Sequence, residues 1–93
     1  MSFDARLLTG VGVLAAVAEA GNFARAAELL GLTPSGVSRA VARLEARVGV
    51  RLFDRSPRLV TLTEEGRRFH ADTMPLLAGL EEAPLRQLAR RLP

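Results

Sequence analysis

The residue types best suited to specific chemistry are hydroxyl and guanidinium side chains that recur between positions 34 and 46. On an α-helix, at about 100° per residue, they fall on one face together with small residues. Hydroxyl and guanidinium groups donate hydrogen bonds to phosphates and base edges, and small residues let a helix approach another surface closely. The face carries no acidic residue, which favours an anionic partner over an ordinary solvated surface. It consists of Ser35, Ser38, Arg39, Ala42, Arg43 and Ala46.

A second group of basic residues surrounds a predicted turn. Positions 51–55 and 59–62 alternate apolar and polar side chains, which predicts two short β-strands. Ser56-Pro57-Arg58 lies between them, so the segment is expected to form a hairpin, or wing, tipped with Arg. Arg58 is then placed to enter a narrow A·T-rich minor groove, whose negative potential attracts Arg. Arg55 is expected to contact phosphate or to brace the wing.

Three predicted helices must position these residues. Apolar residues at helical spacing predict the first over about residues 5–20. The second begins after the N-cap Asn22 and ends at Gly31. The third begins after the N-cap Thr33 and runs over about residues 34–48, and the tight turn before it is typical of a helix-turn-helix. The expected core faces include Leu7, Leu8, Val11, Leu14, Val17, Ala18, Phe23, Ala26, Ala27, Leu30, Val37, Val41, Leu44 and Val48.

A last helix is predicted after Thr63, an N-cap followed by two acidic residues that suit the helix dipole. Apolar residues at alternating four- and three-residue steps form a heptad-like seam on it. One small domain cannot easily cover such a seam, so we expect a dimer interface, with folding back on the core as the alternative. Pro75 is expected to bend the helix without ending it. The seam consists of Phe69, Thr73, Leu76, Leu80 and Ala83.

Composition argues against several classes of protein. The 93 residues include no Cys, which removes disulfides and thiolate chemistry, and their apolar runs are too short to span a membrane. No secretory signal is visible at the N-terminus. His70 is the only histidine, so we predict no enzyme activity, no metal site and no cofactor. A cytoplasmic location is expected.

Positive charge is concentrated in the middle of the chain. All 13 basic residues are Arg, and eight of them lie within residues 34–68, against four acidic residues there. A localised basic segment is what a phosphate-binding surface requires. The charge therefore points to the same partner as the helix face does.

Four short motifs follow one another across most of the chain. They lie at residues 17–23 (VAEAGNF), 33–39 (TPSGVSR), 52–55 (LFDR) and 62–66 (LTEEG). In this order they resemble the opening, the recognition helix, the wing and the start of the linker helix of LysR-type transcriptional regulators. The resemblance covers about residues 7–69.

The resemblance implies a mainly α winged helix-turn-helix, three helices plus a two-stranded wing, with a C-terminal linker or dimerisation helix. It implies a bacterial regulator that binds double-stranded DNA as a homodimer, with helix 34–48 in the major groove and wing 51–62 in the minor groove. Residues 1–62 would be the DNA-binding domain and 63–93 the linker helix. Family members usually continue into a domain that binds a small-molecule effector, and we expect that domain to be absent from this chain.

Departures from the family pattern shift the expected base contacts. Many members have Gln where Pro34 and Ala40 stand, and often Ala where Gly36 stands. Pro cannot donate a hydrogen bond, so base contacts are expected chiefly from Ser35, Ser38 and Arg39. The full set of expected DNA contacts is Pro34, Ser35, Ser38, Arg39, Ala42, Arg43, Arg55 and Arg58.

Two other interpretations stay open on the sequence. One is a winged-helix regulator of another family. The other is a basic amphipathic module that binds membranes or proteins, suggested by residues 85–92, although it would leave the Ser/Arg face and the hairpin unexplained. Salt-sensitive binding to an inverted repeat in duplex DNA, against binding to liposomes, separates these interpretations.

Overall fold

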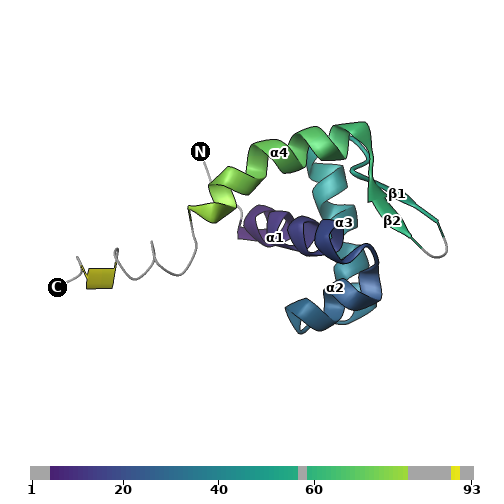
Figure 1. The fold of residues 1–93 in the computed structure, drawn as a ribbon, viewed down its shortest axis with the longest axis horizontal. Helices are drawn as coiled ribbons and strands as arrows, with labels where there is room; N and C mark the ends of the chain where they lie inside the picture. Colours follow the sequence, from purple (N-terminus) through teal and green to yellow (C-terminus); the bar gives the residue numbers. More distant parts are fainter. Residues whose placement is uncertain (1–4, 57–58, 80–88, 91–93) are drawn as a thin grey trace.

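The described part of the chain follows the predicted order of helices and strands (Figure 1). The computed structural model describes residues 5–56, 59–79 and 89–90. Within them the elements are α1 (Ala5–Ala20), α2 (Phe23–Leu30), α3 (Pro34–Val48), β1 (Phe53–Arg55), β2 (Val60–Leu62) and α4 (Glu64–Ala78). The predicted mainly α winged helix-turn-helix, followed by a further helix, is confirmed.

Side-chain caps start three of the helices where the sequence predicts them. The side chains of Asn22, Thr33 and Thr63 each accept a hydrogen bond from the backbone N–H three residues later, at 2.7, 3.0 and 2.9 Å. Gly31 and Gly49 end α2 and α3 with φ of 67° and 83°, a left-handed conformation that Gly adopts without strain. These local signals explain why the helix boundaries agree with the sequence.

The core lies between α1, α2, α3 and the start of β1. Small and aliphatic side chains fill most of it, so the helices pack closely, and Phe53 is its largest fully buried side chain. The buried residues are Val11, Val13, Leu14, Val17, Ala26, Ala27, Val37, Ala40, Val41, Leu44, Leu52 and Phe53.

The predicted core faces are wrong for three leucines at two helix ends. Leu7, Leu8 and Leu30 are 37%, 44% and 37% exposed, although periodicity placed them in the core. They lie in the first turn of α1 and at the last position of α2. Periodicity identifies the face of a helix but not how far along that face its neighbours reach.

The wing is an antiparallel pair in which Phe53 lies opposite Leu62. Its strands are shorter than the alternating pattern at 51–55 and 59–62 predicts, because the backbone at the start of the pattern bonds outside the ladder. The carbonyl oxygen of Arg51 accepts a hydrogen bond from the Thr63 hydroxyl at 2.7 Å. Sheet pairing therefore begins only at Phe53.

The other strand joins the wing to the corner between α1 and α2. The backbone N–H of Val60, the first residue of β2, donates to the carbonyl oxygen of Gly21 at 2.9 Å. Gly21 has a φ of 80° in the turn that separates the two helices. The wing is thus fixed to the helical body by a main-chain bond as well as by its own ladder.

α4 packs on the body and runs past α1 (Figure 1). Gly66 is buried against the chain before β1, where a Cβ on Gly66 would collide with the carbonyl oxygen of Leu52. Phe69, Met74 and Leu77 pack partly buried against the core. α4 continues through Pro75, as predicted, to Ala78. None of the described helices is long and apolar enough to cross a membrane.

Candidate nucleic-acid interface

The predicted contact face of α3 points to solvent. Its core side is buried, so the outward side is presented rigidly rather than by a mobile loop. Ser38 is half-buried at the edge of this face. The exposed members are Pro34, Ser35, Arg39, Ala42, Arg43 and Ala46.

Hydroxyl groups gather at the N-terminal end of α3. Thr33 Oγ1, which caps the helix, lies 3.3 Å from Ser35 Oγ within hydrogen-bond distance. The helix dipole places partial positive charge at this end, which favours an anionic group there. Gly36 leaves room for the cap, because a Cβ at this position would lie 3.1 Å from Thr33 Oγ1.

Ala40 does not belong to the outward face. It is 8% exposed and packs in the core. At a position where many members of the resembled family have Gln, this chain therefore has a small core residue. Ala40 adds no side chain to the outward surface of α3. The expected base contacts of Ser35, Ser38 and Arg39 stay a prediction.

Arg39 of α3 differs from two arginines on other helices. On α2 and α4, Arg25 pairs with Glu28 at 3.1 Å and Arg68 pairs with Glu64 at 2.8 Å. Across residues 5–56 and 59–79, no acidic side chain pairs with Arg39. The outward face of α3 therefore keeps a positive charge available for an anion.

Glu45 is a structural residue of this interface to which the sequence pattern assigned no role. One carboxylate oxygen accepts the backbone N–H groups of Leu52 and Phe53 at 2.8 and 3.3 Å. The other accepts a hydrogen bond from Arg55 Nη2 at 3.4 Å. The side chain is only 14% exposed. It thus ties the wing to the recognition helix, and its one available signal was that it is the single acid within α3.

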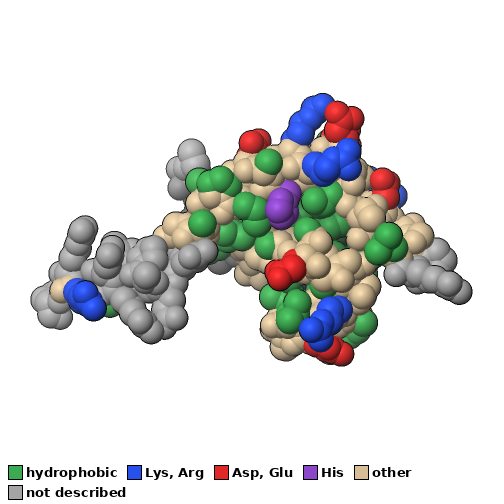
Figure 2. Space-filling model, viewed as in Figure 1, with side chains coloured by type: hydrophobic (Ala, Val, Ile, Leu, Met, Phe, Trp, Pro, Cys, Tyr) green, Lys and Arg blue, Asp and Glu red, His purple; other side chains and the backbone are tan. Residues whose placement is uncertain are grey.

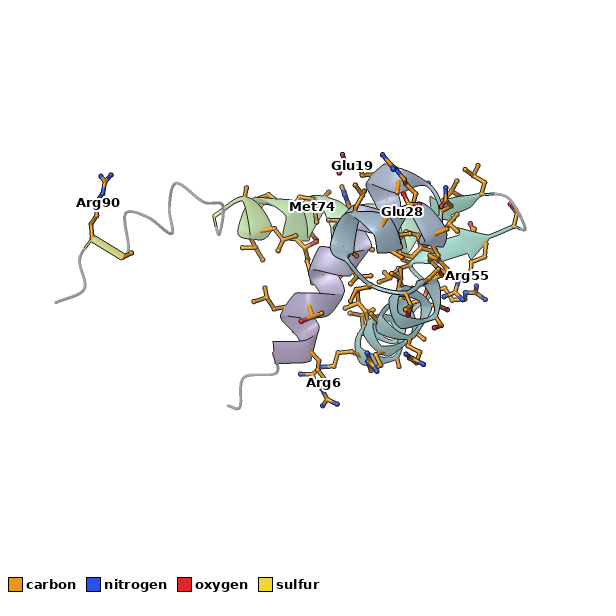
Figure 3. All side chains as sticks on the ribbon, turned by 90° about the horizontal axis from the view of Figure 1, so that it is seen from below. Arg6, Glu19, Glu28, Arg55, Met74 and Arg90 are labelled. Carbon is orange, nitrogen blue, oxygen red and sulfur yellow. The ribbon has the colours of Figure 1, made fainter. Side chains whose placement is uncertain are left out.

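Arg55 lies across three elements. Its guanidinium pairs with Glu45 of α3 and stacks over the ring of Phe23 at the start of α2, 5.2 Å from the ring centroid. Figure 3 shows Arg55, the last residue of β1, beside α3. Of the two expected roles, bracing the wing is the one that this geometry serves, and a phosphate contact stays a prediction.

The base of the wing turn is closed by Ser56. Its hydroxyl donates to the carbonyl oxygen of Leu59 at 3.0 Å and accepts the Leu59 N–H at 3.1 Å. The Ser56 N–H also donates to the same carbonyl at 2.9 Å. Only two residues remain between them, and Arg58, the expected minor-groove residue, lies outside the described residues.

The predicted dimerisation seam divides into three parts. Phe69 packs partly buried against the core, and Thr73 donates its hydroxyl to the Phe69 carbonyl oxygen at 2.7 Å. Leu76 is 72% exposed. Leu80 and Ala83 lie outside the described residues.

Comparisons with known proteins agree on one family. The sequence model described as "Bacterial regulatory helix-turn-helix protein, lysR family" matches residues 8–67. The chain is 42% identical over 77 residues to the HTH-type transcriptional regulator CrgA of Neisseria meningitidis, covering 83% of this chain and 26% of CrgA. It is 51% identical over 74 residues to a probable hydrogen peroxide-inducible genes activator of Mycobacterium xenopi, covering 80% and 39%. The chain thus spans between a quarter and two fifths of the length of these relatives.

Solved structures agree in fold. The crystal structure of the CbnR DBD–DNA complex matches with a TM-score of 0.79 and 34% identity, covering 90% of this chain and 97% of that one. The BenM DBD in complex with catB site 1 DNA matches with a TM-score of 0.79 and 28% identity, covering 90% and 88%. Residues 5–56 and 59–79 form four helices and a two-stranded wing, and the family model matches residues 8–67. The chain belongs to the LysR family of bacterial regulatory helix-turn-helix proteins and is a winged helix-turn-helix DNA-binding domain of that family.

Proposed function

We propose that the domain binds operator DNA by placing the outward face of α3 in the major groove. The observation that carries this proposal is the acid-free face of α3, which a packed core holds outward and which Glu45 joins to the wing. A major groove about 12 Å wide admits one α-helix. Named relatives and solved neighbours that regulate transcription or are bound to DNA support it.

Within this face, Arg39 is proposed to contact a base edge, most simply a guanine, to which Arg can donate two hydrogen bonds. Ser35 and Ser38 supply hydroxyl donors near the positive end of the helix, and Arg43 supplies charge for phosphate. Pro34 and Ala42 contribute by being small, because they let the helix lie close to the groove floor.

For the wing, Arg58 is proposed to enter the minor groove. Arg55 is proposed either to contact phosphate or to brace the wing against the helices.

The domain is proposed to act as a homodimer through the segment after the wing, with residues 1–62 as the DNA-binding unit and 63–93 as the linker. Leu76 is exposed, and Figure 2 shows hydrophobic side chains gathered on the face over α4 and α1. An apolar patch of this kind is typical of an interface. Two-fold partners would place two α3 helices about 34–36 Å apart along the DNA.

The wider setting is carried over from the family. A cytoplasmic bacterial protein that acts on DNA, regulated by a small-molecule effector held in a separate domain, fits the relatives' description as transcriptional regulators. For this domain itself the function is binding, and no catalytic step is proposed.

The decisive experiment selects bound sequences from a random pool of duplexes and measures their affinity against salt concentration. Sequence-specific binding should yield an inverted repeat, and the logarithm of affinity should fall linearly with the logarithm of salt concentration. A pool that shows no enrichment, or binding to liposomes in place of duplexes, would contradict the proposal.

A further inference from the structure

Pro34 exposes an apolar ring at the leading end of the recognition helix. It is the first residue of α3, directly after the N-cap Thr33, and its side chain is exposed. Leu32, two residues earlier, is 47% exposed as well. Pro suits the first helical position because its φ is fixed near the helical value, but it has no backbone N–H to donate. The Pro34 side chain therefore presents only apolar surface, and the backbone nitrogen beside it adds no donor.

The cap of α3 holds this ring in a fixed place. The Gly36 N–H donates to Thr33 Oγ1 at 3.0 Å, and the Val37 N–H donates to the Thr33 carbonyl oxygen at 3.0 Å. The turn before the cap is closed by the Leu32 N–H, which donates to the carbonyl oxygen of Ala27 at 2.9 Å. The first turn of α3 is thus bonded on both sides of Pro34, and the position of the ring is set by the fold.

Pro34 lies beside the residues proposed to contact bases. Pro34 and Ser38 are four residues apart, so they are neighbours on the surface of α3. Arg39 is about 7.5 Å farther along the helix than Pro34. The N-terminal residues of a recognition helix are those that contact base edges in the major groove. The placement proposed for Ser38 and Arg39 therefore brings the Pro34 ring against a base edge of the same half-site.

One group in the major groove suits an apolar ring. The base edges there carry hydrogen-bond acceptors and donors, together with the C5 methyl group of thymine. A Pro ring placed over an acceptor or a donor would remove water from it without supplying a hydrogen bond, which is unfavourable. Over the methyl group, two apolar surfaces leave water together.

We propose that Pro34 is a specificity-determining residue that recognises a thymine of the operator through its C5 methyl group. The inference rests on the proposed function, because it requires α3 in the major groove. It adds a base preference based on apolar contact to the hydrogen-bonded contacts proposed for Arg39 and the two serines.

The test removes the methyl group from the DNA. In one half-site of the selected duplex, each thymine is replaced in turn by uracil, which lacks the methyl group and keeps the base pair. One replacement should weaken binding of the unmodified chain by about fourfold, the loss expected when one buried methyl group is removed. The same replacement should leave the affinity of Pro34→Ala nearly unchanged, whereas Pro34→Val, with a branched apolar side chain, should again be sensitive to it.

Matched variants separate this contact from other effects. Both substitutions at Pro34 keep the cap residue Thr33, so their circular dichroism spectra and their affinity for a random duplex should equal those of the unmodified chain. Ala42→Gly removes the methyl group of another exposed small residue on α3 and should retain the sensitivity to uracil.

Each remaining result contradicts one proposal. An enriched half-site without thymine, or uracil that changes nothing, would overturn the role of Pro34 and leave the proposed function intact. An effect of uracil that persists in Pro34→Ala, or that Ala42→Gly abolishes, would assign the methyl contact to another side chain and overturn the inference. Absence of any enriched sequence would instead reject the proposed function.

Discussion

The carboxylate of Glu45 on α3 and the guanidinium of Arg55 on β1 lie 3.4 Å apart, and the same carboxylate accepts the two backbone N–H groups that precede and begin the strand. One side chain thereby fixes the start of the wing against the recognition helix. Because it is largely buried, its loss leaves main-chain donors without partners.

Replacement of Glu45 by Ala is expected to destabilise the fold. Leaving buried donors unsatisfied costs about 1–3 kcal/mol. Denaturant unfolding followed by circular dichroism measures the change, with Glu28→Ala as the control because Glu28 forms an exposed ion pair worth at most about 1 kcal/mol. Equal effects of the two substitutions would contradict the role given to Glu45.

Two glycines in helices should respond to Ala in opposite directions. Gly66→Ala forces a methyl group into the carbonyl oxygen of Leu52. It should destabilise the domain by at least about 1–3 kcal/mol, the range typical of overpacking. Gly12→Ala meets nothing within 4 Å and should stabilise α1 by up to about 1 kcal/mol. Thermal unfolding of the two variants tests this contrast, and a neutral Gly66→Ala would show that α4 does not approach Leu52 so closely.

Replacement of Arg39 by Ala should reduce binding to the selected operator far more than binding to random duplex. A bidentate contact with guanine contributes about 1–3 kcal/mol of discrimination. Competition binding with both duplexes gives the two losses separately. Equal losses would make Arg39 a phosphate contact.

Replacement of Arg58 by Ala should lower affinity most on operators flanked by A·T tracts. The narrow minor groove of such tracts has an enhanced negative potential that attracts an inserted Arg. Binding to operators with A·T-rich and G·C-rich flanks measures the preference. If the preference persists without Arg58, the wing does not sense groove width.

Joint replacement of Leu76 and Leu80 by Glu should yield a folded monomer that has lost high-affinity operator binding. Leu76 is 72% exposed, so the domain itself should tolerate the charge, whereas Leu77→Glu, at a position packed against the core, should destabilise it. Light scattering and unfolding curves separate these outcomes. A monomeric unmodified chain at high micromolar concentration would reject the dimer, and a double variant that unfolds would favour a seam folded on its own core.

Local signals in the sequence predicted the helices well. Asn22, Thr33 and Thr63 act through bonds to residues three positions away, so the caps depend little on the rest of the fold. The outward side of α3 was also predictable, because burial of the Val37 and Val41 side follows directly from the helical period.

Interactions between distant segments were not predictable in the same way. Glu45 bonds to residues seven, eight and ten positions later, and no period connects them. The placement of Phe69 on the core likewise depends on where α4 crosses α1. The contacts of Arg55 could not be predicted either, because its partners Phe23 on α2 and Glu45 on α3 come together only in the folded chain.

The main-chain bond from Val60 to Gly21 has a consequence for the proposed complex with DNA. With Glu45 holding one strand to α3 and Gly21 holding the other to the helix corner, the wing and the recognition helix cannot move independently. The protein then fixes the distance along the duplex between its major-groove contact and its minor-groove contact. Inserting one base pair between the two contacts shifts one by about 3.4 Å, and the DNA must deform to restore both.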